Sequence, residues 1–253
     1  MRWAPGGRGT PQVTIENRRL RSAGRMRATA ATCFTISRFA RATALPRHIW
    51  NMAIVVIGGH SRSVGKTSVV AGLIAALPAY HWTAFKITQY GHGICSRNGK
   101  ACDCATGDHS WAISEEQTRS GDSDTSRFMA AGATRAWWVR TEQGRLAEAM
   151  PAIRRKLGES ANAIVESNSL LKFLHPDLYI TVLDPATADF KRSAQEFLDR
   201  ADAVILHEAG RTRWRGISLK PVADHPIFYI RPPQYVTGEI VEFVKDKLKT
   251  GNV

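Results

Sequence analysis

Residues suited to phosphate chemistry stand together at positions 58–67, in the run Gly-Gly-His-Ser-Arg-Ser-Val-Gly-Lys-Thr. Glycine lets such a loop present backbone N–H groups to phosphate oxygens, and the first turn of a following helix adds more amides and the positive end of its dipole. Lys66 would reach the β- and γ-phosphates, and the Thr67 hydroxyl would join the ligand shell of Mg²⁺. The run therefore predicts binding of a nucleoside triphosphate, ATP or GTP, together with Mg²⁺.

The spacing within this loop departs from the common P-loop pattern. Five residues separate Gly59 from Gly65, where the common pattern has four and would require a glycine at the position of His60. The longer spacing resembles that of dethiobiotin synthetases and their relatives. The alternative is a strand-to-helix turn that binds no ligand. Nucleotide contacts are expected from the loop and the start of the next helix, at Gly59, Ser61, Ser63, Val64, Gly65, Lys66, Thr67 and Ser68.

Two acids and a second lysine end or begin elements that lead to one edge of a sheet. Glu166 closes a short apolar run, which places its carboxylate at the carboxyl edge, where ligands bind. Phosphoryl transfer needs a metal ion and cationic groups, so Glu166 is predicted to act on Mg²⁺, with Lys66 and Lys86 as catalytic cations. Asp124 begins a helix, where it would either help to hold Mg²⁺ or cap the helix. A solvated acid and a surface lysine are the plain alternatives for Glu166 and Lys86.

A Cys- and His-rich segment interrupts the pattern of elements at about residues 88–122. Loops of this length are usually functional, so it is expected to be a functional insertion. Within eighteen residues it holds five potential metal ligands, namely His92, Cys95, Cys102, Cys104 and His109. Thiolates and imidazoles are preferred ligands of Zn²⁺, so a zinc site drawn from His92 and the three cysteines is predicted. An Fe–S cluster, a redox thiol pair and an inert loop are the alternatives.

The elements that must position these residues alternate along the chain from Met52 onward. Apolar runs alternate with amphipathic stretches, which predicts an α/β fold of three layers, with a mostly parallel sheet covered by helices. Strands are expected at residues 53–57, 82–87, 136–140, 163–166, 178–183, 203–206 and 227–230. Helices are expected at residues 66–77, 123–131, 142–157, 188–201 and 238–248. Residues 52–253 are thus expected to form one P-loop NTPase domain.

The basic charge of the chain is concentrated at its start. Residues 1–51 hold ten arginines, no lysine and one acid, and so carry +9 of the net +13. This segment is expected to be an extension rather than a domain: a mistaken start before Met52, a transit peptide or a basic arm. No run approaches the roughly 20 apolar residues of a membrane-spanning helix, so no membrane is expected. Four cysteines fit a reducing, cytoplasmic setting.

Three stretches together resemble the molybdopterin-guanine dinucleotide biosynthesis protein B family, a P-loop group related to dethiobiotin synthetase and the metal-assembly GTPases. The first is the phosphate loop followed by Lys86. The second is residues 124–133, Asp-Thr-Ser-Arg-Phe-Met-Ala-Ala-Gly-Ala, similar to the family's Asp-Ser-x-Arg-x-x-x-Ala-Gly-Ala. The third is residues 164–166, Ile-Val-Glu, similar to Val-Glu-Gly, although Ser167 replaces the glycine. The resemblance covers about residues 53–170.

The resemblance implies metal or nucleotide roles for Asp124 and Glu166, and a contact of Arg127 with anionic substrate. It implies an ATP or GTP hydrolase of molybdenum-cofactor or metallocentre assembly, with a partner protein, and a homodimer is compatible with it. A ligase of the dethiobiotin-synthetase type or a small-molecule kinase is the alternative. A nucleic-acid-binding protein is a less favoured third, supported by the basic extension and the patch at residues 211–215. The base stays open, because the sequence contains no convincing Asn-Lys-x-Asp guanine motif.

Overall fold

The computed structural model describes residues 52–90, 110–208 and 214–250, all of which belong to one unit of the chain. The basic extension at residues 1–51 lies outside the described residues. So do His92, Cys95, Cys102, Cys104 and His109, and with them the predicted zinc or Fe–S site. Within the described residues, no helix is long and apolar enough to span a bilayer.

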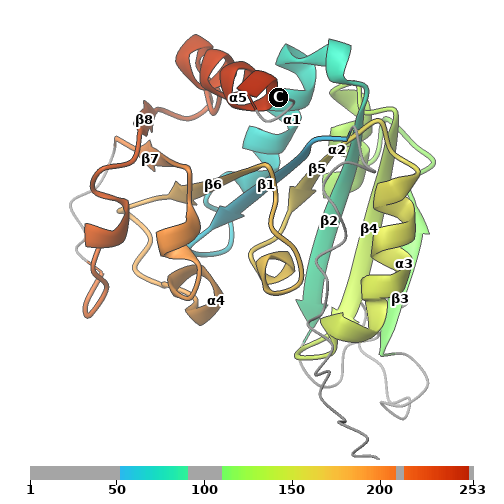
Figure 1. The fold of residues 1–253 in the computed structure, drawn as a ribbon, viewed down its shortest axis with the longest axis horizontal. Helices are drawn as coiled ribbons and strands as arrows, with labels where there is room; N and C mark the ends of the chain where they lie inside the picture. Colours follow the sequence, from blue (N-terminus) through green and yellow to red (C-terminus); the bar gives the residue numbers. More distant parts are fainter. Residues whose placement is uncertain (1–51, 91–109, 209–213, 251–253) are drawn as a thin grey trace, which may run out of the picture. The chain divides into compact units, whose positions relative to one another are not determined.

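A single sheet of eight strands organises the described part of the chain. Its order is β3-β4-β2-β5-β1-β6-β7-β8, and every neighbouring pair is parallel except β3 and β4 (Figure 1). The strands are β1 (Ile54–Gly59), β2 (Trp82–Tyr90), β3 (Trp111–Glu115), β4 (Arg135–Glu142), β5 (Asn162–Glu166), β6 (Leu178–Leu183), β7 (Ala203–His207) and β8 (Ile227–Ile230). All seven predicted strands are confirmed, and β3 was not predicted.

Helices cover both faces of the sheet. On one face lie α1 (Lys66–Ala76), α2 (Asp124–Ala130) and α5 (Gly238–Thr250). On the other lie α3 (Leu146–Gly158), the short α4 (Arg192–Gln195) and the 3₁₀ turns η3 (Ser169–Lys172), η4 (Leu198–Arg200) and η5 (Lys220–Val222) (Figure 1). A further turn, η2 (Pro78–Tyr80), connects α1 to β2.

The alternation of side chains along the strands explains the three layers. Val55 and Ile57 of β1 belong to the core under α1, whereas Val56 between them belongs to the core under α3. All three side chains are fully buried. A strand buried on both faces must be apolar at every position, which is why the strands read as continuous apolar runs. The predicted three-layer α/β P-loop fold is confirmed.

Two predicted helices differ from the structure. The helix expected from residue 142 begins at Leu146, because β4 continues to Glu142 and a turn with Gly144 at φ 88° follows. The helix expected at residues 188–201 is wrong. Only the four residues of α4 are α-helical there, because the backbone up to Lys191 is bonded to the phosphate loop instead: the Lys191 N–H donates to the His60 carbonyl at 2.8 Å.

The packing of α3 makes a direct test of the second core layer possible. Ile153 is 1% exposed and lies on the apolar stripe of α3 with Leu146, Met150 and Leu157. We expect Ile153→Ala to lower the free energy of unfolding by about 2–5 kcal/mol, since the cavity cannot fully collapse. Arg155→Ala, on the exposed side of the same helix, should change it by less than about 0.5 kcal/mol. Urea denaturation measures both; equal losses would contradict this packing.

Candidate functional site: the phosphate loop and its charged edge

The sheet register brings the predicted residues to one place. Ile57 of β1 pairs with Glu166 of β5, and Glu166 pairs on its other side with Lys86 of β2. Because these strands are parallel, their carboxyl ends meet at one edge, where the loop between β1 and α1 also lies. Residues separated by 80 or 99 positions in sequence are thereby in contact at this edge.

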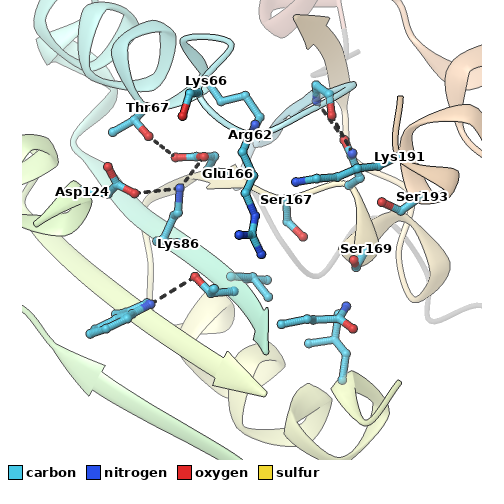
Figure 2. Close-up of a pocket in the computed structure, with 18 of the residues that line it drawn as sticks. Arg62, Lys66, Thr67, Lys86, Asp124, Glu166, Ser167, Ser169, Lys191 and Ser193 are labelled. Carbon is cyan, nitrogen blue, oxygen red and sulfur yellow. Dashed lines mark hydrogen bonds and ion pairs between the residues drawn. The ribbon is translucent and has the colours of Figure 1, made fainter. Parts of the chain in front are cut away.

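Four charged and polar side chains form a connected network beside the loop. The Thr67 hydroxyl donates to Glu166 Oε2 at 2.8 Å, and Lys86 Nζ donates to Glu166 Oε1. Lys86 Nζ also forms an ion pair with Asp124 Oδ2 at 2.8 Å (Figure 2). Glu166 is 2% exposed, so its charge depends on these partners. The structure therefore brings together Thr67, Lys86, Asp124 and Glu166, which come from four different elements.

Burial and neighbouring charge set the protonation of the two lysines. Burial lowers the pKa of Lys66 to about 8, although the Glu166 carboxylate acts in the opposite direction. Burial would also lower the pKa of Lys86, but Glu166 and Asp124 outweigh it and raise that pKa. Burial would raise the pKa of Asp124, but the hydrogen bond and charge of Lys86, with Thr67 and Arg127, together outweigh it and lower that pKa. Lys86 thus stays protonated. Lys66 becomes fully protonated more readily when an anion lies beside it, because a nearby negative charge favours the charged form of a lysine.

The helix cap that the sequence left open belongs to Ser123 rather than to Asp124. The Ser123 hydroxyl accepts a hydrogen bond from the Ser126 N–H at 3.0 Å and donates to Glu116 Oε2 at 2.8 Å. Thr125 donates to the same carboxylate oxygen at 2.8 Å. Asp124 lies one position inside α2, where its carboxylate is not needed as the cap and faces Lys86. The capping alternative for Asp124 is therefore wrong.

The remaining predicted loop residues differ in what they can offer a nucleotide. The Ser61 hydroxyl donates to Asp189 Oδ2 at 2.7 Å, and Val64 is buried with its carbonyl against His207 Nε2 at 3.1 Å. Ser63 is exposed and adopts a positive φ of 55°. Lys66 Nζ donates to the carbonyl of Ser61 within the loop. Ser61 and Val64 can therefore serve a phosphate through their backbone N–H groups, and Ser63 also through its hydroxyl.

Arg127 and Ser68 lie at the outer border of the network. Arg127 donates from its NH2 group to the Ser68 hydroxyl at 3.1 Å, and its NH1 group lies 3.9 Å from Asp124 Oδ1. The Arg127 side chain is 48% exposed, so it is accessible to a ligand. This placement allows the predicted contact with an anionic group but gives no direct measure of it.

Two glycines are required by close approaches to the loop. Gly65 has φ 90°, and a Cβ there would lie 2.2 Å from the Tyr235 ring. A Cβ on Gly58 would lie 2.2 Å from Asn168 Oδ1. The Asn168 amide accepts from the Gly59 N–H and donates to the Gly59 carbonyl, both at 2.9 Å. Asn168 thus fixes the end of β1 where the loop begins, a role that sequence reasoning missed.

His60 holds the other side of the loop. Its Nε2 accepts the Asp184 N–H at 3.0 Å, and its Nδ1 lies 2.7 Å from the Asp189 carbonyl, so Nδ1 must carry the proton. The ring is fully buried, with centroids 5.1 Å from Phe190 and 4.9 Å from Trp214. A neutral imidazole therefore connects the loop to the segment that follows β6. The common pattern would have glycine at the position of this histidine.

The loop opens into a cavity of about 1780 Å³. The network of Thr67, Lys86, Asp124 and Glu166 lines one part of it, and Arg62, Lys191, Ser167, Ser169 and Ser193 line another (Figure 2). Sequence reasoning missed the second group. Ser167 and Ser169 could have been found from their position directly after Glu166, but no sequence signal marks Lys191.

The donor set of the network fits Mg²⁺. The Thr67 hydroxyl and the carboxylates of Glu166 and Asp124 are all oxygen donors, which this ion prefers, and they face the phosphate loop. Among the residues that the structure describes, no group of three or more His, Cys, Asp and Glu side chains forms a metal site by itself. Mg²⁺ would therefore be held jointly by these oxygens and by phosphate.

Comparison with known proteins identifies no family. No protein-family model and no curated protein matches the sequence. Among solved structures, HypB from Helicobacter pylori, solved with nickel, is 14% identical with a TM-score of 0.41, over 80% of this chain and 88% of HypB. LpxK from Aquifex aeolicus, solved with ATP, is 18% identical with a TM-score of 0.41, over 73% of this chain and 54% of LpxK.

The Signal Recognition Particle 54 kDa protein from Aeropyrum pernix, solved with GDP, is 15% identical with a TM-score of 0.38, over 80% of this chain and 47% of that one. The chain thus spans only about half the length of two of these three proteins. At such low identity and TM-score, their activities carry no argument for this chain. The fold assignment depends on the sheet order and on the loop between β1 and α1.

The buried His60 predicts a pH dependence of stability. Burial lowers its pKa below the ordinary 6.5, against the opposing hydrogen bond to Asp189, and protonation would break the bond from the Asp184 N–H. The unfolded chain therefore binds a proton at His60 more readily than the folded chain does. His60 thus stabilises the folded state less at acidic pH than at neutral pH. We expect stability to fall as pH drops through 6.5 toward the lower folded-state pKa.

Urea denaturation at pH 7.5 and pH 5.5 measures this effect. His60→Gln should be less stable at pH 7.5 and should lose less stability between the two pH values than the wild-type protein. His175→Gln, at an exposed histidine, is the matched control and should behave like the wild type. An unchanged pH dependence in His60→Gln would show that His60 is not the group responsible.

Proposed function

We propose that this protein binds a nucleoside triphosphate with Mg²⁺ at the phosphate loop and catalyses transfer of the terminal phosphoryl group. In the favoured form, water is the acceptor, and the protein is an ATP or GTP hydrolase acting in molybdenum-cofactor or metallocentre assembly. The observation that carries the proposal is the bond between Thr67 and Glu166 beside Lys86, at the open end of the loop. The assembly role rests on the sequence resemblance alone.

The network supports a division of roles among its members. Lys66, whose charge is weakly compensated in its buried setting, would bind the β- and γ-phosphates with the loop amides. Thr67, Glu166 and Asp124 would hold Mg²⁺. When bound there, this ion would neutralise part of the charge that develops during transfer. Lys86 is held by Glu166 and Asp124 and would supply a fixed positive charge near the transferred group.

A second candidate is a ligase or kinase that transfers the phosphoryl group to a small molecule. The size of the cavity favours it, because about 1780 Å³ exceeds the roughly 300–1,000 Å³ of ordinary ligand pockets. The cavity extends from the loop along β2 to Tyr90 and past Ser169 to Phe173. A nucleotide and a second molecule could occupy it together. The predicted Cys and His metal site lies outside the described part of the chain and stays a prediction. The nucleic-acid role also stays a prediction, and within its patch at residues 211–215 Trp214 is buried against His60.

Nucleotide binding is tested by removing the loop lysine. Titration calorimetry of the protein begun at Met52, with ATP and GTP in the presence of Mg²⁺, should show saturable binding of at least one of them. Lys66→Ala should weaken that binding by about ten- to a hundredfold, because a charge-assisted contact to phosphate is lost. Lys249→Ala, on the exposed surface of α5, is the control and should bind like the wild type. Equal affinity in Lys66→Ala would overturn the proposal.

Catalysis is tested separately at Glu166. Glu166→Gln keeps the shape of the side chain but removes the charge that Thr67 and Lys86 surround. We expect Mg²⁺-dependent phosphate release to fall by about a hundredfold or more, because the charge arrangement around the phosphates is lost. Nucleotide binding measured without Mg²⁺ should persist. Glu159→Gln, at an exposed acid after α3, is the control. Wild-type rates in Glu166→Gln would exclude the proposed metal role.

A further inference from the structure

The cavity beside the loop carries more positive than negative charge. Among the described residues that line it, seven are arginine or lysine and four are aspartate or glutamate. The four acids are largely matched: Asp124 and Glu166 pair with Lys86, and Glu196 pairs with Lys172 at 3.0 Å. Lys66 is assigned to the nucleotide. The cations that remain to be explained are those on the opposite side of the loop from the network.

Three cations of the lining lie on that side, Arg62, Lys191 and Arg192. The side chains of Arg62 and Lys191 form no hydrogen bond or ion pair with another side chain of the described residues. Figure 2 shows the Lys191 side chain extending toward Arg62, whose guanidinium lies in the same cavity, with Ser167, Ser169 and Ser193 around that space. Like charges that converge repel each other, which is unfavourable unless an anion lies between them.

The fold fixes this pair in place. The Lys191 N–H donates to the His60 carbonyl at 2.8 Å, and Asp189, two residues earlier, is bonded to both His60 and Ser61. Arg62 follows Ser61 directly. The two cations therefore lie on segments that are joined to each other by three hydrogen bonds. The backbone that carries both cations is thus held in place, with Arg62 exposed and Lys191 half-buried, and such support is what an anion site needs.

The pair lies next to the phosphate-binding lysine. Burial and the charge of Arg62 both lower the pKa of Lys191, and the charge of Lys191 in turn contributes to the lowered pKa of Lys66. Lys191 is thus near enough to interact electrostatically with both Arg62 and Lys66. An anion held between Arg62 and Lys191 would lie close to the terminal phosphate of a nucleotide bound at the loop.

We propose that Arg62 and Lys191, with the hydroxyls of Ser167, Ser169 and Ser193, form a second anion site that holds the acceptor of the phosphoryl group, a small molecule bearing a carboxylate or a phosphate. The guanidinium of Arg62 can bind either group with two parallel hydrogen bonds. This inference rests on the proposed nucleotide binding at the loop and deepens the second candidate function, transfer to a small molecule.

The site makes the transfer chemically simple for an acid. An oxygen of the acceptor carboxylate or phosphate forms a bond to the γ-phosphorus, while the bond from that phosphorus to the oxygen bridging the β- and γ-phosphates breaks. The electron pair leaves with the nucleoside diphosphate. The two products are the phosphorylated acceptor, which is an anhydride, and the nucleoside diphosphate. An ionised acceptor needs no general base. This fits a cavity edge rich in cations. Asp189, an acid beside this edge, accepts a hydrogen bond from the Ser61 hydroxyl and partly offsets the positive charge there.

The test uses protein whose loop is already filled. The wild type is saturated with Mg²⁺ and the β,γ-imido analogue of ATP or GTP, whichever binds, and is then titrated with inorganic phosphate and, separately, with succinate. We expect at least one probe to bind, and the stronger one identifies the acceptor as a phosphate or a carboxylate. Arg62→Gln and Lys191→Gln should each weaken that binding by about tenfold or more. Their affinity for the imido nucleotide should change by less than about twofold. Lys249→Gln is the charge-matched control.

Three outcomes overturn the proposal in distinguishable ways. If the wild type binds neither nucleotide, the proposed function fails and this inference fails with it. If it binds nucleotide but neither probe, the second site alone is excluded. If Arg62→Gln and Lys191→Gln weaken the imido nucleotide as strongly as Lys66→Ala does, the two cations serve the triphosphate rather than an acceptor.

Discussion

The buried carboxylate of Glu166 is the constraint on which the rest of the site depends. A carboxylate that is 2% exposed is strongly unfavourable unless cations and hydrogen-bond donors surround it. Lys86 and Thr67 meet that need from the neighbouring strand and from α1. Lys86 is itself mostly buried, with 18% of its side chain exposed, so it in turn needs Asp124. Four elements must therefore be in register before any one of these charges is stable. The four side chains of the charged edge therefore depend on one another, and the position of each limits where the other three can lie.

The phosphate loop is shaped by its neighbours more than by its own flexibility. Asn168 fixes its first end, His60 binds it to the segment after β6, and the Tyr235 ring lies against Gly65. The Trp214 ring lies against His60 at a tilt of 60° and donates from its indole N–H to the Thr187 carbonyl at 2.8 Å, which holds the same segment from outside. A loop with so many external contacts can contain a histidine where the common pattern places glycine. The longer spacing is thus matched by extra support.

The sequence predicts best what depends on burial along a strand. The parallel strands contain long apolar stretches because both faces of the sheet are covered, so these runs are easy to find. Lys86 and Glu166 could be placed because each lies at or near the carboxyl end of such a run. Strand β3 was missed because all five of its residues are half-buried and it pairs antiparallel at the edge, without the crossover helix that marks a parallel strand. Asp124 was ambiguous because Ser123 and Asp124 can both cap a helix, and only the hydrogen bond from the Ser126 N–H to the Ser123 hydroxyl decides between them.

The failed helix after β6 is the most informative error, because the same contacts that break it create the second half of the cavity. Residues in that region have helical spacing, but His60 accepts the Asp184 N–H and its carbonyl accepts the Lys191 N–H, so the backbone between them cannot bond to itself as a helix would. As a result Lys191 is carried to the loop instead of lying on a helix surface. Charge is then segregated around Lys66, with the carboxylates of Asp124 and Glu166 on one side and Arg62 and Lys191 on the other. Such a field would orient a triphosphate with its metal-binding oxygens toward the acids and would leave its far side open to a second anion.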